Sequence, residues 1–137
     1  MQTLLIDANV LVRFLVSDVP EQTDAVKRLF SEAENHEVRL CLDPIIVAET
    51  IYILTSFYRK PRGKVAATLL LIVKFPHIFV EQRERMIDAL TRYANNSIDF
   101  ADAWLAAGAV IQGMGVASFD RDFDKFNDVT RYRPGDA

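Results

Sequence analysis

Short apolar runs alternate along this chain with longer segments whose apolar residues repeat at helical spacing. The runs are too short for helices, so we expect strands at 3–6 and 38–42, a strand or extended connector at 78–80, and strands at 116–118 and near 129–132. Such alternation is typical of parallel strands covered by helices on both faces. We therefore expect a single α/β domain over residues 1–137, a three-layer α/β/α arrangement around a central, mainly parallel sheet of four to five strands.

Proline marks the start of two of the expected helices. Pro20 opens one of them, in which apolar residues recur at helical spacing as far as Ala33. Asp43 and Pro44 form an N-cap followed by a first-turn proline, and predict a helix that runs to about Tyr58. Further helices are expected at 10–16, 65–74, 83–94 and about 99–112.

The composition is that of a folded protein with a mild negative charge. Half of the residues are hydrophobic, which excludes disorder as the dominant state, and 16 basic residues stand against 19 acidic ones. A formal net charge of −3 argues against a strongly basic domain that binds nucleic acid through phosphate contacts alone. The longest apolar run, 65–73, is far shorter than the roughly 18 residues that span a bilayer. The start of the chain lacks a signal peptide's basic region, so we expect a cytoplasmic protein with no membrane contact.

Four of the acidic residues stand alone in apolar segments. Each is the only charged residue in its stretch or directly follows an apolar run: Asp7, Glu49, Asp102 and Asp120. Because removing water from a carboxylate costs several kcal/mol, acids in apolar surroundings are usually paired or bound to a cation. The four together indicate a site in which carboxylates share a cation.

Their places in the expected elements bring the four acids to one edge of the sheet. Asp7 and Asp120 follow the ends of strands, whereas Glu49 and Asp102 lie in the first or second turn of helices. In an open parallel sheet, strand ends and the following helix starts share the edge at which ligands bind. Carboxylates crowded there repel one another, and a divalent cation such as Mg²⁺ or Mn²⁺ removes that repulsion. The sequence therefore predicts a carboxylate metal site.

Structural roles compete with this interpretation. Asp7 is a good N-cap for the helix that follows it, and capping is the favoured role of Asp99. The acids that begin with Asp120 also have the spacing that opens a calcium-binding EF-hand loop. That loop would need Gly at Lys125 and Glu at Arg131, so the EF-hand hypothesis fails.

The ordered motifs resemble those of the PIN-domain ribonucleases, and most closely the VapC-type toxins of type II toxin–antitoxin modules. The resemblance rests on the segment Leu5-Ile6-Asp7-Ala8-Asn9-Val10-Leu11 and on Glu49 in its apolar helix. It continues through Asp99-Phe100-Ala101-Asp102-Ala103 and Ser118-Phe119-Asp120-Arg121-Asp122-Phe123. Order and spacing agree along nearly the whole chain.

The resemblance implies an endoribonuclease that uses one or two Mg²⁺ or Mn²⁺ ions. It also implies a homodimer that is inhibited by a small antitoxin protein. By this resemblance, Asp7 and Asp102 are metal ligands, and Glu49 and Asp120 complete the acidic catalytic site. The accessory positions that it implies are Asn9, Ser118, Asp99 and Asp122.

Contacts with RNA have a weaker sequence signal. Four basic residues occur within six positions, directly after the rings of Phe57 and Tyr58, which suits a backbone contact with stacked bases: Arg59, Lys60, Arg62 and Lys64. A solvated loop explains the same segment equally well. Arg13 and Arg121 lie near the acidic segments and are further candidates for phosphate contacts.

Other functions remain as alternatives. A phosphatase of the haloacid-dehalogenase (HAD) type would need an aspartate at Asn9 as its proton donor, and an amide cannot supply that proton. A PIN nuclease of RNA processing that is not a toxin is one alternative. Another is a PIN-like module that binds without catalysis, although the presence of all four acids argues against it. Without the four acids, 15 acidic residues would face 16 basic ones, so the negative charge does not exclude an RNA substrate.

Overall fold

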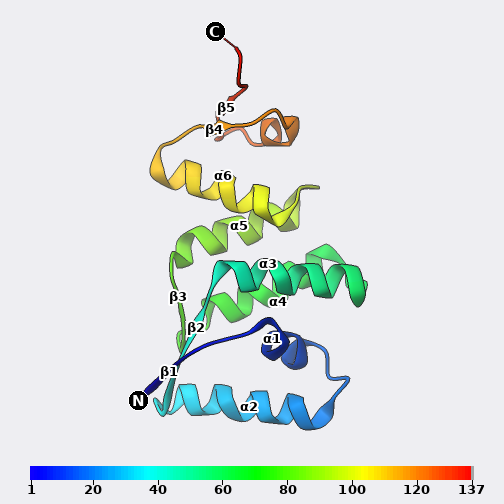
Figure 1. The fold of residues 1–137 in the computed structure, drawn as a ribbon, viewed down its shortest axis with the longest axis vertical. Helices are drawn as coiled ribbons and strands as arrows, with labels where there is room; N and C mark the ends of the chain where they lie inside the picture. Colours follow the sequence, from blue (N-terminus) through cyan, green and yellow to red (C-terminus); the bar gives the residue numbers. More distant parts are fainter. Residues whose placement is uncertain (137) are drawn as a thin grey trace. The chain divides into compact units, whose positions relative to one another are not determined.

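The computed structural model describes residues 1–136, and the chain forms two compact units (Figure 1). The amino-terminal unit is Met1–Arg83, and the carboxy-terminal unit begins at Glu84. The first contains β1–β3 and α1–α4. The second contains α6, β4, β5 and all of α5 except its first residue.

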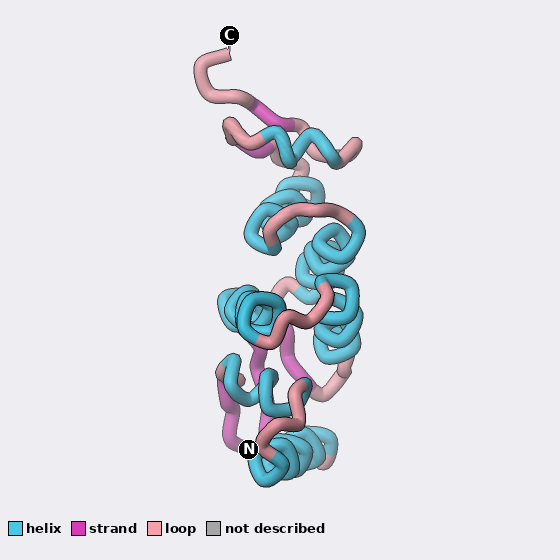
Figure 2. The backbone as a smooth tube through the Cα atoms, turned by 90° about the vertical axis from the view of Figure 1, so that its right-hand side faces the viewer, coloured by secondary structure: helices cyan, strands magenta, loops and turns pink. Residues whose placement is uncertain are grey.

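A three-stranded parallel sheet organises the amino-terminal unit. Its strands are β1 (Gln2–Leu5), β2 (Val38–Leu42) and β3 (Ile78–Val80), in the order β1-β2-β3, and they run side by side in Figure 2. Leu40 of the central strand is fully buried. In contrast, Leu5 at the end of β1 is 79% exposed. The prediction of a strand near residues 3–6 is confirmed.

Four α-helices and one π-helical segment surround this sheet. They are α1 (Ala8–Leu15), α2 (Pro20–Glu34), α3 (Pro44–Tyr52), η1 (Ile53–Phe57) and α4 (Arg62–Lys74). As expected, Pro20 and Pro44 occupy first-turn positions. Oδ1 of Asp43 accepts a 2.8 Å hydrogen bond from the Ile45 N–H and caps α3.

The predicted long helix beyond Pro44 changes its winding near the end. From Ile53 to Phe57 it becomes a π-helix, and the Tyr58 N–H donates to the Ile53 carbonyl at 3.2 Å. α2 packs on β2 and α4 packs on β3, while α1 lies against both α2 and α3. The core of this unit includes the fully buried side chains of Leu11, Val47 and Leu69.

Two helices and a two-stranded parallel sheet form the carboxy-terminal unit. Their bounds are α5 (Arg83–Asn95), α6 (Phe100–Gln112), β4 (Val116–Ala117), the 3₁₀ helix η2 (Arg121–Lys125) and β5 (Arg131–Tyr132). α6 ends at Gly113, whose φ of 68° is left-handed and suits glycine at a helix C-terminus. The buried side chains of Met86, Leu90 and Phe123 belong to the core of this unit.

The predicted α/β class with parallel strands is confirmed. The expected central sheet of four to five strands is divided: the described strands form one sheet of three, β1-β2-β3, and one of two, β4-β5. None of the described helices is both long and apolar enough to cross a membrane. That residues 1–137 act as one domain stays a prediction.

Candidate metal centre

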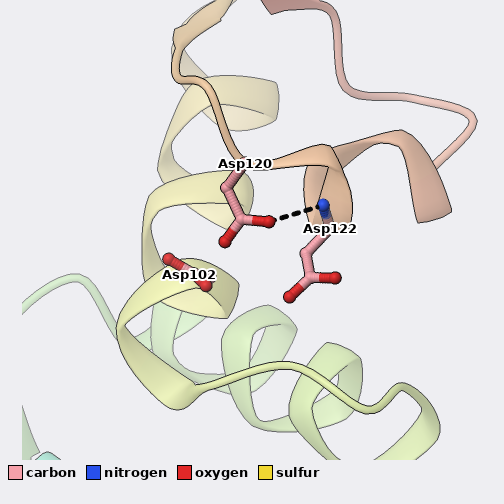
Figure 3. Close-up of side chains that lie close together, drawn as sticks. All are labelled: Asp102, Asp120 and Asp122. Carbon is pink, nitrogen blue, oxygen red and sulfur yellow. Dashed lines mark hydrogen bonds between the residues drawn. The ribbon is translucent and has the colours of Figure 1, made fainter.

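Three aspartates of the carboxy-terminal unit point toward one another (Figure 3). Each offers a carboxylate oxygen, and these three oxygens lie within 4.8 Å of one another: Asp102, Asp120 and Asp122. Asp102 is the third residue of α6, Asp120 is the N-cap of η2, and Asp122 lies in the first turn of η2. We call these three residues the aspartate cluster.

Local hydrogen bonds fix the segment that carries two members of the cluster. The Asp120 N–H donates to Oγ of Ser118 at 2.9 Å, and the Asp122 N–H donates to Oδ1 of Asp120 at 2.8 Å. Aspartate favours such turns because its short side chain can replace the missing partner of a helix's first N–H groups. The chain therefore turns sharply after β4 and presents both carboxylates on one side.

The cluster carries more negative than positive charge. Burial raises the pKa of the Asp102 carboxyl, and repulsion from Asp120, Asp99 and Asp122 raises it further. Lys125 offsets part of this charge, with its Nζ atom 3.1 Å from Oδ1 of Asp122. The negative charge of the cluster therefore favours a bound cation.

The donor atoms of the cluster suit a hard divalent cation. Mg²⁺ takes oxygen ligands, keeps several of its own waters and commonly binds through one or two carboxylates. Mn²⁺ accepts the same carboxylate and water ligands. The partly exposed aspartates of the cluster leave room for such waters, since Asp120 is exposed and Asp102 and Asp122 are half-buried. The residues present therefore fit a magnesium or manganese ion.

The family model for the PIN domain matches residues 4–129. The chain belongs to the PIN-domain family. No curated protein and no solved structure matched the chain in the other two comparisons. The matched range includes the aspartate cluster as well as Asp7 and Glu49.

The other two predicted acids of this PIN domain lie in its amino-terminal unit. Asp7 follows β1 and caps α1, where its Oδ1 accepts a 2.8 Å hydrogen bond from the Ala8 N–H. Asp7 and Asp43 line one pocket of about 360 Å³ beyond the ends of β1 and β2. Glu49 is the sixth residue of α3. The structure thus brings Asp102 and Asp120 together, while the four-acid set stays a prediction.

The burial expected for the four acids is largely wrong. Asp7, Glu49 and Asp120 are exposed, and Asp102 alone among them is half-buried. The apolar neighbours of Glu49 do not indicate burial, because α3 exposes Ile45 and Tyr52 at 76% and 70%. The acids of this PIN domain are therefore not explained by the cost of burial, and repulsion among close carboxylates carries the argument for a cation.

The accessory acidic and polar positions have defined places. Asp122 belongs fully to the aspartate cluster, although the resemblance implied only an accessory role for it. Its spacing from Asp120 at a helix start was the available signal. Asp99 is the N-cap residue of α6, as expected, although its side chain makes no capping hydrogen bond. Ser118 accepts the Asp120 N–H. Asn9 is exposed in the first turn of α1.

The residues predicted to contact RNA differ in their hydrogen bonds and in their exposure. Arg13 donates to Asp18 at 2.8 Å and to the Tyr58 hydroxyl at 3.2 Å, and the hydrogen bond with Tyr58 raises the pKa of its guanidinium. Arg62, at the start of α4, is half-buried. The remaining predicted contacts are exposed: Arg59, Lys60, Lys64 and Arg121.

Proposed function

We propose that this PIN domain is a metal-dependent endoribonuclease that hydrolyses phosphodiester bonds within RNA. The single observation that carries the proposal is the meeting of three carboxylate oxygens within 4.8 Å. PIN domains are generally nucleases, so this cluster lies in a fold whose members cut phosphodiesters. The resemblance of the sequence motifs to those of toxin ribonucleases supports RNA as the substrate.

In this proposal the aspartate cluster holds one or two Mg²⁺ or Mn²⁺ ions. A bound ion of this kind lowers the pKa of its water and neutralises charge on the scissile phosphate. The protein's own contribution is to position the ligands. Ser118 holds the Asp120 backbone, and Asp120 in turn holds the Asp122 backbone, so both carboxylates keep a fixed direction.

We further propose that Asp7 and Glu49 are required for cleavage. The cap that Asp7 forms on α1 uses Oδ1 and fixes the direction of the carboxylate. Glu49 is exposed on α3, and its carboxylate is accessible. Replacement by the matching amide removes charge while keeping size, so Asp7→Asn and Glu49→Gln separate a chemical role from a packing role.

The exposed basic segment that precedes α4 and continues into its first turn is proposed to bind the RNA backbone. Arg59, Lys60 and Lys64 are exposed, and Phe57 beside them is 75% exposed. Exposed cations next to an exposed ring suit a single strand, whose phosphates and bases are both accessible.

A role as the toxin of a type II pair is proposed on the resemblance to VapC-type toxins. It predicts a cytoplasmic homodimer that binds a small antitoxin. Expression alone should arrest growth, and co-expression with the product of a short neighbouring reading frame should restore it. Harmless expression without that product would instead favour a PIN nuclease of RNA processing.

Cleavage of an internally structured RNA labelled at one end tests the enzymatic proposal. Wild type with Mn²⁺ should yield internal fragments, and EDTA, Asp7→Asn or Glu49→Gln should abolish them. Asp24→Asn is the matched control. Asp24 is exposed on α2, and its substitution removes one charge at a position other than Asp7 and Glu49. Equal cleavage by all variants would refute the site. Release of phosphate from a small ester without RNA cleavage would refute the nuclease.

A further inference from the structure

A pocket of about 380 Å³ lies at the start of the strands of the amino-terminal unit. Val38, the first residue of β2, and Ile78, the first residue of β3, both line it. Asp7 and Asp43 follow the other ends of β1 and β2. The pocket therefore lies at the opposite edge of the sheet from these two acids, and the proposed nuclease activity does not account for it.

The polar lining of this pocket is basic. Two histidines and two arginines line it: His36, Arg39, His77 and Arg83. The rings of His36 and His77 lie 5.7 Å apart between centroids, at 68° to one another. Among the described residues that line the pocket, none is acidic. Such a concentration of basic groups without a carboxylate attracts an anion.

The two arginines are held in place by different kinds of contact. The Arg39 guanidinium lies over the Phe79 ring, 4.8 Å from its centroid, which leaves its N–H edge able to donate. The Arg83 guanidinium donates through Nη2 to the Ile78 carbonyl. Its Nε atom is buried and has no hydrogen-bond partner within the described chain. Arg83 adds a second guanidinium charge to the lining of the pocket.

The chemistry of these four side chains selects the kind of anion. Guanidinium groups donate paired hydrogen bonds to the oxygens of phosphate, and histidines add donors at the same site. A divalent metal is disfavoured because two guanidinium charges surround the histidine pair. The volume of the pocket falls within the range of small-molecule sites and exceeds what a lone phosphate needs.

We propose that this pocket binds the phosphate group of a small phosphorylated molecule of about nucleotide size. His36, His77, Arg39 and Arg83 supply the donors. The Phe79 side chain, 46% exposed beneath Arg39, provides an apolar surface for the rest of the molecule. The site is separate from the aspartate cluster in sequence and in chemistry, since it recognises an anion rather than a cation.

Calorimetric titration of the full chain in EDTA, without RNA, tests the proposal. Inorganic phosphate and adenosine monophosphate are the two probes, and EDTA excludes binding through a metal ion. Arg39→Gln and His77→Gln should each weaken binding about tenfold or more, the loss expected for one charged hydrogen bond. Arg28→Gln, which removes an exposed charge of α2 outside the pocket, should bind as wild type does.

The outcomes distinguish the source of the phosphate. Tighter binding of the nucleotide than of inorganic phosphate supports an organic phosphate of this size. Equal binding of the two probes would show that only the phosphate group is recognised and would overturn the nucleotide-size part of the proposal. Arg39→Lys, which keeps the charge but loses the paired donors, should bind more tightly than Arg39→Gln, and this difference separates loss of binding from loss of fold. No binding of either probe, or equal binding by all variants, would overturn the proposal. Variants that lose RNA binding but still bind both probes as wild type does would also overturn it. RNA cleavage should be unchanged in Arg39→Gln, so failure here is separate from failure of the nuclease.

Discussion

The backbone N–H of Asp122 donates a 2.8 Å hydrogen bond to Oδ1 of Asp120 (Figure 3). One carboxylate therefore orients the residue that carries the next. The same turn depends on Ser118, whose Oγ accepts the Asp120 N–H at 2.9 Å. The geometry of the aspartate cluster is thus set by short-range hydrogen bonds at the end of β4.

Loss of the Ser118 hydroxyl should weaken metal binding. Ser118→Ala leaves the Asp120 N–H without its acceptor, and loss of a group that orients a metal ligand commonly costs 10- to 100-fold in affinity or activity. We expect a Mn²⁺ dissociation constant at least about tenfold higher, measured by calorimetry. Ser118→Thr keeps the hydroxyl and should stay close to wild type. If alanine and threonine behave alike, the hydroxyl has no positioning role.

Removal of the Asp102 charge should stabilise the metal-free protein. Asp102 is half-buried and faces the charges of Asp120, Asp99 and Asp122, which together with burial raise its pKa. Like charges about 4 Å apart repel by about 1 kcal/mol in a water-like medium, so Asp102→Asn should raise the unfolding temperature in EDTA by about 2–4 °C. Added Mn²⁺ should stabilise wild type more than the variant. A lower unfolding temperature for Asp102→Asn in EDTA would contradict this account of the charges.

The pair formed by Arg92 and Asp128 should make the carboxy-terminal unit sensitive to acid. Arg92 donates two hydrogen bonds to Asp128, at 2.8 and 2.6 Å, and they hold the pKa of the Asp128 carboxyl below its ordinary value. The carboxylate therefore stabilises the fold above the unfolded pKa of about 4, and this contribution is lost as pH falls through the lowered folded pKa.

Denaturant unfolding at several pH values tests this pair. Because the Asp128 side chain is 51% exposed, we expect Asp128→Asn to cost only about 1 kcal/mol at pH 7. The difference from wild type should shrink below pH 4. Asp136→Asn, which alters a more exposed pair at 3.5 Å, is the control and should change little. A constant difference at all pH values would show that the pair does not titrate as described.

The exposed cations before α4 should affect RNA binding rather than chemistry. Lys60 and Arg59 are exposed, so Lys60→Gln with Arg59→Gln should raise KM several-fold and leave kcat unchanged. The salt dependence of KM should also weaken, because fewer counterions are released. Arg28→Gln on α2 serves as the control for overall charge. A fall in kcat with unchanged KM would indicate that these residues act in catalysis and not in RNA binding.

Local rules predicted much of the fold. Pro20 and Pro44 located two helix starts, because each start depends on the backbone preferences of one residue. The π-helical turn at Ile53–Phe57 could not be predicted in this way. Helical apolar spacing is almost the same in both windings, and the choice between them depends on packing around buried Leu54.

The candidate site shows the same division. The order of motifs identified Asp102 and Asp120, but the place of Asp122 in the cluster depends on the 3₁₀ helix η2, which apolar spacing does not predict. The exposure of Glu49 was missed because apolar neighbours were taken to mean a buried helix, whereas α3 exposes several of them. Side-chain exposure depends on which faces are covered, and residue spacing alone does not determine that.

The rate of RNA cleavage as a function of Mn²⁺ concentration, for wild type and Asp102→Asn, tests whether the aspartate cluster holds a catalytic ion. The wild-type rate should rise to a plateau with Mn²⁺ and vanish in EDTA. At the same Mn²⁺ concentration Asp102→Asn should be slower by about 100-fold or more, because a ligand of the ion that stabilises transition-state charge is lost. A wild-type rate that is unchanged by EDTA, or an Asp102→Asn rate equal to wild type, would contradict the account.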